Sequence, residues 1–142
     1  MTAMDRHLDA SPEAGRAFVR RDLRGPVVML NLLRFRALAD YSAAPHLQPE
    51  TPISGEEAYA RYLEHTTPFL TAAGSEVVFS GDGGSFLIGP PDARWDRVLL
   101  VRHASVEAFL AFASDAAYLA GAGHRTAALD DSRLLPITES GR

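Results

Sequence analysis

Two neighbouring residues, His124 and Arg125, carry side chains suited to chemistry on a small organic molecule. An imidazole can act as a general base, and a guanidinium can hold a carboxylate or an enolate through parallel hydrogen bonds. The pair follows the glycine-containing segment 121–123, which we expect to be flexible. The alternative is a structural role, with Arg125 in a salt bridge to Asp130 or Asp131 and His124 on the surface. The sequence leaves both interpretations open.

Asn31 is an amide in the middle of the otherwise apolar segment Pro26–Phe35, on the same predicted strand face as Met29 and Leu33. A buried amide without a hydrogen-bond partner costs roughly 1–3 kcal/mol. Asn31 therefore either bonds to neighbouring backbone or marks a pocket. We take it as a third candidate catalytic residue, and Arg34, near the end of the same segment, as a candidate for substrate binding.

Three aromatic side chains are further candidates for substrate binding. Tyr59 and Tyr62 share the apolar stripe of a predicted helix, and His103 ends a predicted strand. Such stripes are mostly core, and the functional alternative has a phenol lining a cleft between helix and sheet.

The remaining motifs argue against metal ions and bound cofactors. The histidines lack the i, i+4 spacing of a helical metal site, and the chain has no cysteine. Nothing singles out a haem ligand. The segment Gly81–Gly84 has neither the spacing nor the following helix of a dinucleotide site, and we predict a hairpin turn there. The absence of lysine excludes Schiff-base chemistry on this chain. We expect no metal and no cofactor.

Length and composition are those of one globular domain. The chain has 142 residues, 46% of them hydrophobic and 23% charged. The net charge of −4 argues against nucleic acid as a partner. Residues 1–15 contain no apolar run of signal-peptide length, and no stretch of the chain is long and apolar enough to cross a membrane. We therefore expect a cytoplasmic protein without a membrane partner.

The hydrophobic pattern and the helix-breaking residues predict the order helix, strand, helix, strand, strand, helix, strand. The first helix, starting at Ser11, belongs to an N-terminal helical extension over 1–25, and the main domain covers 26–142. The main domain begins with a predicted strand at 26–35 and a loop at 37–53. A helix capped by Ser54 follows, and Pro68 should kink it or restart its turn. The remaining predicted elements are short strands at 77–79 and 85–88, a strand at 97–101, helices capped by Ser105 and Asp115, and a strand at 132–137.

A β-α-β-β-α-β order is the split unit of α+β ferredoxin-like folds, an antiparallel sheet with helices on one face. The second face would meet water and should then carry polar residues at alternate positions. Val28, Leu30 and Leu32 are apolar instead. We therefore predict a homodimer, in which a second copy covers this face.

Several segments together resemble the domain-of-unknown-function 1330 family, over roughly Pro26–Thr138. The resemblance rests on the run Pro26–Phe35, on Ala58-Tyr59-Ala60-Arg61-Tyr62, on Gly81, on Trp95-Asp96-Arg97 and on His124-Arg125-Thr126-Ala127-Ala128-Leu129. It implies a dimeric α/β barrel, a superfamily that includes cofactor-independent monooxygenases, small isomerases, haem peroxidase-like enzymes and ligand-sensing domains. The N-terminal helix and the 37–53 loop look like additions to the family's shortest members. Fold alone does not choose among these functions.

Two hypotheses about function follow. In the first, the chain is a small-molecule enzyme resembling a cofactor-independent monooxygenase or isomerase, in which a histidine is the base and Asn31 and Arg125 hold an enolate in a cleft between sheet and helices. In the second, it is a non-catalytic dimeric module that binds a ligand or serves an accessory role.

Overall fold

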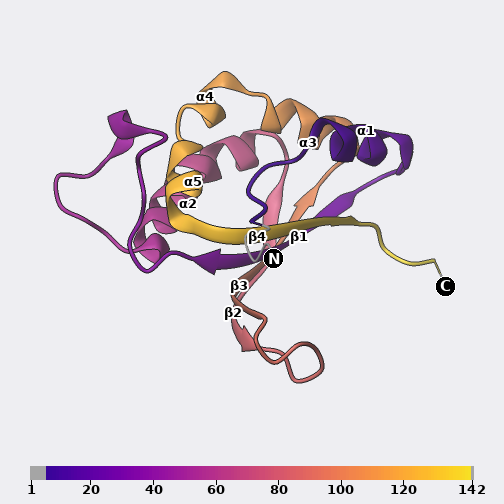
Figure 1. Cartoon of the computed structure of the whole chain (residues 1–142). Coiled ribbons are helices and arrows are strands. Elements are labelled where there is room, and N and C mark those ends of the chain that lie inside the picture. Colours follow the sequence, from indigo (N-terminus) through magenta and orange to yellow (C-terminus); the bar gives the residue numbers. More distant parts are fainter. Residues whose placement is uncertain (1–5, 142) are drawn as a thin grey trace.

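A four-stranded antiparallel sheet forms the centre of the protein (Figure 1). The computed structural model describes residues 6–141, so residues 1–5 of the predicted N-terminal extension lie outside it. The strands lie in the order β2-β3-β1-β4. Their bounds are β1 Val27–Phe35, β2 Glu76–Ser85, β3 Arg94–His103 and β4 Leu129–Ile137.

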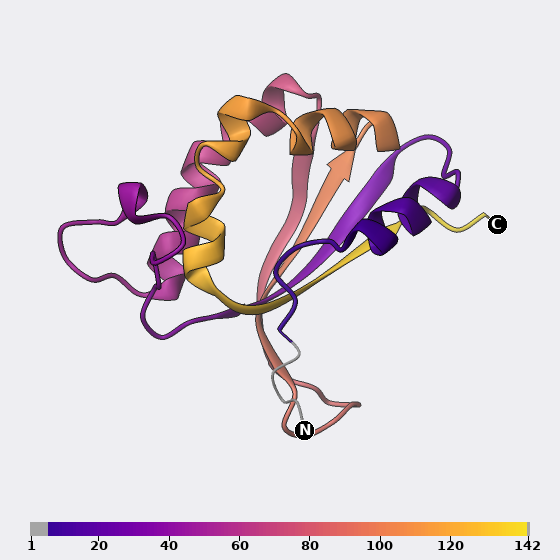
Figure 2. The ribbon, with the colours of Figure 1, turned by 45° about the horizontal axis from the view of Figure 1, so that its top comes forward.

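The helices between the strands gather on one face of this sheet (Figure 2). They are α2 Gly55–Ala72, α3 Val106–Ala113, α4 Ala116–Leu119 and α5 Gly123–Ala128, preceded by α1 Pro12–Arg20 and the short 3-10 helix η1 Pro45–Leu47. The strand order and the one-sided helix layer confirm the ferredoxin-like prediction. Within residues 6–141, no helix has the length and apolar character needed to cross a bilayer.

The predicted helix starts are confirmed by their capping hydrogen bonds. The side chains of Ser11, Ser54 and Ser105 each accept a bond of 3.0 Å from a backbone N–H three residues on, and Asp115 accepts one of 3.1 Å from Ala117. Pro68, where we predicted a kink or a restarted turn, lies inside α2, which continues through it to Ala72 as one helix.

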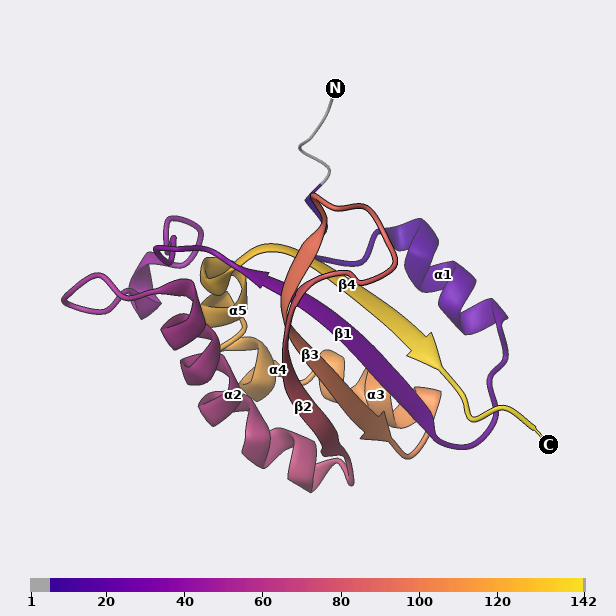
Figure 3. The same cartoon turned by 90° about the horizontal axis from the view of Figure 1, so that it is seen from below.

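The two faces of β1 have different neighbours. Met29 and Leu33 face the helices and are 2% and 0% exposed, respectively. Leu30 points to the opposite face, where the register pairs it with Leu100 of β3 and Leu135 of β4. Helix α1 does not cover that face, since Phe18 packs edge-on against Phe109 of α3 at 5.9 Å. Among the described elements, none lies across it (Figure 3).

The predicted hairpin turn at Gly81–Gly84 is wrong. These residues lie inside β2, which continues to Ser85, and the turn follows it. The reason for a glycine there is a close approach of two backbones: a Cβ on Gly83 would meet the carbonyl oxygen of Trp95. The hairpin projects away from the helix layer and exposes Leu87 at its tip by 99% (Figures 1 and 2).

The glycines before His124 allow close packing. Gly121 is buried, and a Cβ on it would meet the ring of His65 on α2. A Cβ on Gly123 would likewise meet the side chain of Ala44. Segment 121–123, which we expected to be flexible, therefore lets α5 lie directly against α2 and the 37–53 segment.

Candidate functional site

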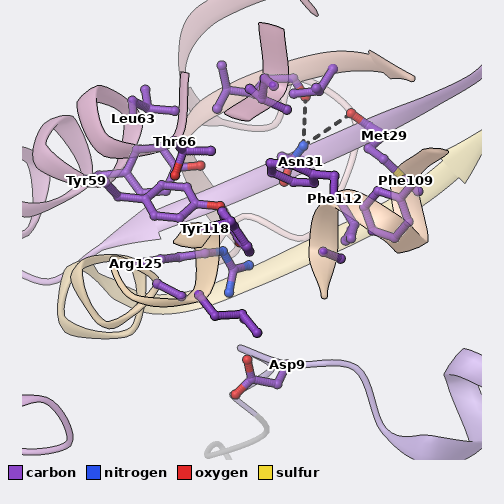
Figure 4. Close-up of a pocket in the computed structure, with 18 of the residues that line it drawn as sticks. Asp9, Met29, Asn31, Tyr59, Leu63, Thr66, Phe109, Phe112, Tyr118 and Arg125 are labelled. Atoms are coloured by element: carbon purple, nitrogen blue, oxygen red, sulfur yellow. Dashed lines mark hydrogen bonds between the residues drawn. The ribbon is translucent and has the colours of Figure 1, made fainter. Parts of the chain in front are cut away.

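A cavity of about 380 Å³ lies between the helix-facing side of the sheet and the helices. Strands β1 and β3 form its floor, and α2, α3, α4 and α5 contribute side chains to its walls (Figure 4). Its volume is within the roughly 300–1,000 Å³ typical of small-molecule sites. The lining is mainly apolar and includes Met29, Leu70, Val101, Phe109 and Phe112.

Asn31 is bonded internally and also lines the cavity, so both alternatives from the sequence hold. Its Nδ2 donates to the carbonyl of Met29 at 3.2 Å and to that of Leu99 at 3.4 Å, which Figure 4 shows as dashed lines. Both bonds are long for this type. They employ only the amide nitrogen, so Oδ1 could accept a hydrogen bond from a bound molecule.

Three tyrosines stand on the helix side of the cavity. Tyr59 and Tyr62 of α2 are 2% and 8% exposed, which is the core position that their helical stripe predicted, and both also line the cavity. The Tyr62 hydroxyl bonds to the hydroxyl of Tyr118, a residue that sequence reasoning did not select, at 2.7 Å. Burial raises the pKa of Tyr59 to about 12 and that of Tyr62 well above its ordinary value. The phenols of Tyr59 and Tyr62 therefore stay protonated at neutral pH.

Thr66 is the most unusual group in the cavity wall. It is 2% exposed, and its Oγ1 has no hydrogen-bond partner within the described structure. A buried hydroxyl in this state costs roughly 1–3 kcal/mol. The sequence placed Thr66 on the apolar stripe of α2 without giving it a role. The sequence feature that could have singled out Thr66 is its small polar side chain, four residues after Tyr62, within a stripe of large apolar side chains.

His103 lines the cavity at the far end of β3. Its Nδ1 is 2.7 Å from the Ser75 hydroxyl, and its ring packs against Phe109 and Phe112. Burial lowers the pKa of His103, so the imidazole is neutral at pH 7. With Nδ1 occupied, Nε2 is the nitrogen that could take a proton from a ligand.

Arg125 also lines the cavity, and the salt bridge considered for it is not present. Its guanidinium donates to the carbonyl of Leu8 at 2.6 Å and to the Ser132 hydroxyl at 3.3 Å. Asp131 is paired with Arg133 instead, at 2.7 Å. Between residues 6 and 141, Arg125 forms no ion pair.

His124 lies outside the cavity, although it precedes Arg125. Adjacent helical residues point about 100° apart, and the His124 Nδ1 meets the Tyr41 hydroxyl at 2.7 Å on the other side of α5. Burial, with nearby Arg61 and His65, lowers the pKa of His124. The structure therefore separates His124 from Asn31 and Arg125.

Arg34 is also away from the cavity. Its guanidinium lies 4.6 Å from the centre of the Trp95 ring and donates to the Arg94 carbonyl at 2.7 and 3.0 Å. Arg34 follows Leu33 and points to the other side of the sheet, because successive strand residues alternate. Its contacts are those of a residue that packs on Trp95.

The N-terminal segment contributes residues that the sequence did not suggest. Leu8, Asp9 and Ala10 line the cavity near Arg125. Backbone bonds hold this segment, including one from the His7 N–H to Asp131 at 2.7 Å. Across residues 6–141, no group of three or more His, Cys, Asp or Glu side chains is arranged to hold a metal ion.

Fold and cavity together define a ferredoxin-like α+β protein with one enclosed face and an internal, mostly apolar site. The chain belongs to the family described as "Domain of unknown function (DUF1330)", because the model of this family matches residues 50–137. The match begins after β1, so the strand-one run that contributed to the resemblance lies outside it.

Two solved structures extend the similarity to nearly the whole chain. One is the methylated RPA0582 protein, at 36% identity and a TM-score of 0.85, covering 97% of this chain and 98% of that one. The other is the RPA0582 protein of unknown function from Rhodopseudomonas palustris, at 35% identity and a TM-score of 0.83, covering 96% and 98%. Among curated proteins, no sequence matches this chain.

Proposed function

We propose that this chain binds a small organic molecule in the cavity between sheet and helices, acting in the cytoplasm. The observation that carries the proposal is the Thr66 hydroxyl, which is buried in the wall of a cavity of about 380 Å³ and has no hydrogen-bond partner among residues 6–141. A ligand with a polar atom near Thr66 would remove the cost of that unmade bond. The other polar groups of the lining, from Asn31, Tyr118 and Arg125, can orient such a ligand.

The catalytic form of this proposal is an enzyme without a cofactor that acts on an activated, enolisable compound. His103 takes the place of His124 as the base, because it is neutral at pH 7 and lines the cavity. Its Nε2 would accept a proton from the carbon next to a carbonyl, and the electron pair of that C–H bond would form an enolate held by Arg125. Return of the proton to another carbon completes an isomerisation. With dioxygen as co-substrate, the enolate carbon would take one oxygen atom as a new carbonyl. The second oxygen atom would leave as water with the two hydrogens of the former CH2 group, and the substrate itself would supply the electrons.

The second candidate is a ligand-binding module without chemistry, and the spacing along the sheet favours it. Asn31 pairs with Leu99, and His103 lies four residues further along β3. At about 3.4 Å per residue the two positions are roughly 14 Å apart. This separation places Asn31 far from the proposed base, which weakens the catalytic form, because Asn31 was expected to help Arg125 hold the enolate.

Ligand screening followed by isotope exchange separates these candidates. Thermal shift with aromatic and short-chain acids identifies compounds that raise the melting temperature, and proton NMR in D2O then follows their acidic C–H groups. Exchange that His103→Asn abolishes and His124→Gln preserves would support the enzyme. Binding without exchange would support the module. A panel that never raises the melting temperature would contradict the binding proposal itself.

We also infer that the chain is a homodimer, joined through the sheet face away from the helices. That face carries an apolar surface, here called the outer patch, made of Val28, Leu30, Leu32, Phe79, Val98, Leu100, Leu135 and Ile137. Phe79 and Leu135 are 54% and 52% exposed. A second copy presents the same patch, so a two-fold pairing is self-complementary.

The β2–β3 hairpin supports this assembly, since its exposed tip residues Phe86, Leu87 and Ile88 project on the side where the second copy would lie (Figures 1 and 2). Light scattering at micromolar concentration tests the dimer. A mass near twice 15.4 kDa is expected, and a mass near 15.4 kDa would contradict it.

A further inference from the structure

We propose that the ligand of the cavity is a carboxylic acid with an apolar body and a second, uncharged polar group: Arg125 binds the carboxylate, and Thr66 meets the hydroxyl or carbonyl on the body. The inference rests on the proposed function and adds the class of ligand to it. Its three parts are an available positive charge, neutral donors and an apolar space between them.

Arg125 supplies the charge. A guanidinium has five N–H donors, and the contacts to Leu8 and Ser132 employ two of its nitrogens. The acids that follow it in sequence are engaged elsewhere: Asp131 with Arg133 and the His7 N–H, and Asp130 with Arg6 at 3.7 Å. No carboxylate among residues 6–141 neutralises Arg125. A carboxylate ligand fits this half-buried guanidinium because both are planar and can bond in parallel.

The second polar group is placed by α2. Tyr59, Tyr62 and Thr66 lie on one stripe of this helix, and Thr66 is seven residues after Tyr59. Seven residues correspond to about 10 Å along the helix axis. The Tyr62–Tyr118 hydroxyl pair stands between the two ends. Burial raises the pKa of Tyr62 well above its ordinary value, so this phenol carries no charge at neutral pH and does not repel an anion. An acid near Tyr59 and Arg125 thus has room for an apolar body before Thr66.

Among the described residues that line the cavity, Asp9 is the one carboxylate, and it provides a matched test. Its side chain is exposed, and in Figure 4 it lies apart from the Arg125 guanidinium. Its charge repels a bound carboxylate weakly through solvent. Asp9→Asn should therefore tighten the binding of an acid by a few fold and leave a neutral ligand unchanged.

Titration calorimetry with three related probes tests the proposal on the full chain. The probes are 3-(4-hydroxyphenyl)propanoate, 3-phenylpropanoate and 3-(4-hydroxyphenyl)propan-1-ol. The first should bind best, the alcohol at least tenfold more weakly, and 3-phenylpropanoate several fold more weakly. Arg125→Gln should remove the preference for the acid over the alcohol, and Arg125→Lys should restore part of it.

Thr66→Val keeps the shape of the side chain and removes the unpartnered hydroxyl. It should remove the preference for the hydroxylated acid over 3-phenylpropanoate, while raising the melting temperature of the protein without ligand. Because Arg125→Gln also removes contacts to Leu8 and Ser132, its folding is checked by circular dichroism. If Arg125→Gln fails to fold, Asp9→Asn still tests the charge of the ligand and Thr66→Val still tests its second polar group.

The outcomes separate this inference from the binding proposal. Equal affinity for the acid and the alcohol would overturn the carboxylate assignment and leave a neutral-ligand cavity in place. Equal affinity for the two acids in wild type and Thr66→Val would overturn the role of Thr66. Failure of all three probes to bind would count against the carboxylic-acid inference, and against the binding proposal as well if the wider screen also finds no ligand.

Discussion

The two faces of the sheet start from equally apolar strands and end in different situations. On the helix side, Met29 and Leu33 are buried beneath α2 and α5 or border the cavity. On the opposite side, Leu30 and Leu135 belong to the outer patch, and Leu135 is 52% exposed. Apolar residues on both faces of a strand thus indicate that each face must be covered, whereas what covers each face depends on tertiary structure.

Truncation of one leucine on each face should give the largest difference in the free energy of unfolding. Leu33→Ala should lower the free energy of unfolding by about 2–5 kcal/mol, because it leaves a void in the closed core. Leu135→Ala should cost far less in dilute protein, and its cost should grow with protein concentration as a second copy buries the residue. Urea unfolding at two concentrations measures both. A Leu135→Ala effect independent of concentration would mean that the outer patch stays bare.

A substitution confined to the outer patch should disrupt the dimer without unfolding the protomer. Leu30→Glu puts a charge at the centre of the outer patch, between Leu100 and Leu135, and a like charge faces it in the second copy. Light scattering should return a mass near 15.4 kDa with the fold retained. The matched control is Val19→Glu on α1, which is 55% exposed and outside the patch, and it should remain dimeric. Dissociation of both variants would point to general destabilisation.

A smaller effect is expected within the inner face. Tyr62 and Tyr118 share one hydrogen bond, and Tyr62 is the more buried of the two. Tyr118→Phe should therefore destabilise more than Tyr62→Phe, because it leaves a buried hydroxyl without a partner. A double-mutant cycle by urea unfolding should give a coupling of about 0.5–1.5 kcal/mol. Additive effects of the two substitutions would show that the pair contributes no bond.

The mildest prediction concerns pH, and it again separates the faces. Burial lowers the pKa of both His103 and His124 in the folded protein, below the ordinary value of 6.5. The unfolded chain therefore binds more protons, and stability should fall as pH decreases below about 6.5 until the folded-state pKa values are passed. The outer patch contains no histidine, so the dimer–monomer equilibrium should change little between pH 7.5 and 5.5.

Urea unfolding and light scattering at these two pH values measure the two quantities separately. Replacement of His124 by Gln should reduce the slope of the unfolding free energy against pH, because it removes one titrating group. The surrounding residues Tyr41, Arg61, His46 and His65 remain in place. If the dimer dissociates at pH 5.5 while the unfolding free energy stays constant, the groups that titrate lie at the outer patch and not on the helix side of the sheet.

Much of the fold could be predicted from local signals. The caps at Ser11, Ser54, Ser105 and Asp115 locate helix starts, because each depends on a bond within three residues. The hairpin was misplaced because Gly83 serves a close contact with β3, and no local pattern distinguishes that use from a turn.

The candidate site divides in the same way. Asn31, Tyr59, Tyr62, His103 and Arg125 were chosen from the sequence, and all line the cavity. His124 and Arg34 were chosen on residue type and lie elsewhere, because one helical step or one strand step turns a side chain to another surface. Thr66 and Tyr118 were missed, since the importance of each depends on its burial and on a partner, or the lack of one, distant in the chain.

By itself, the sequence determined the order of the main elements, the apolar character of both faces of β1 and the absence of cysteine and lysine chemistry. These properties depend on periodicity and composition, which act over a few residues. Only the packing of distant segments decided which polar groups meet in the cavity and which acids are paired, and that, within residues 6–141, Arg125 has no ion pair and the Thr66 hydroxyl no hydrogen-bond partner. Those outcomes depend on contacts between segments far apart in the chain, and local pattern does not encode them.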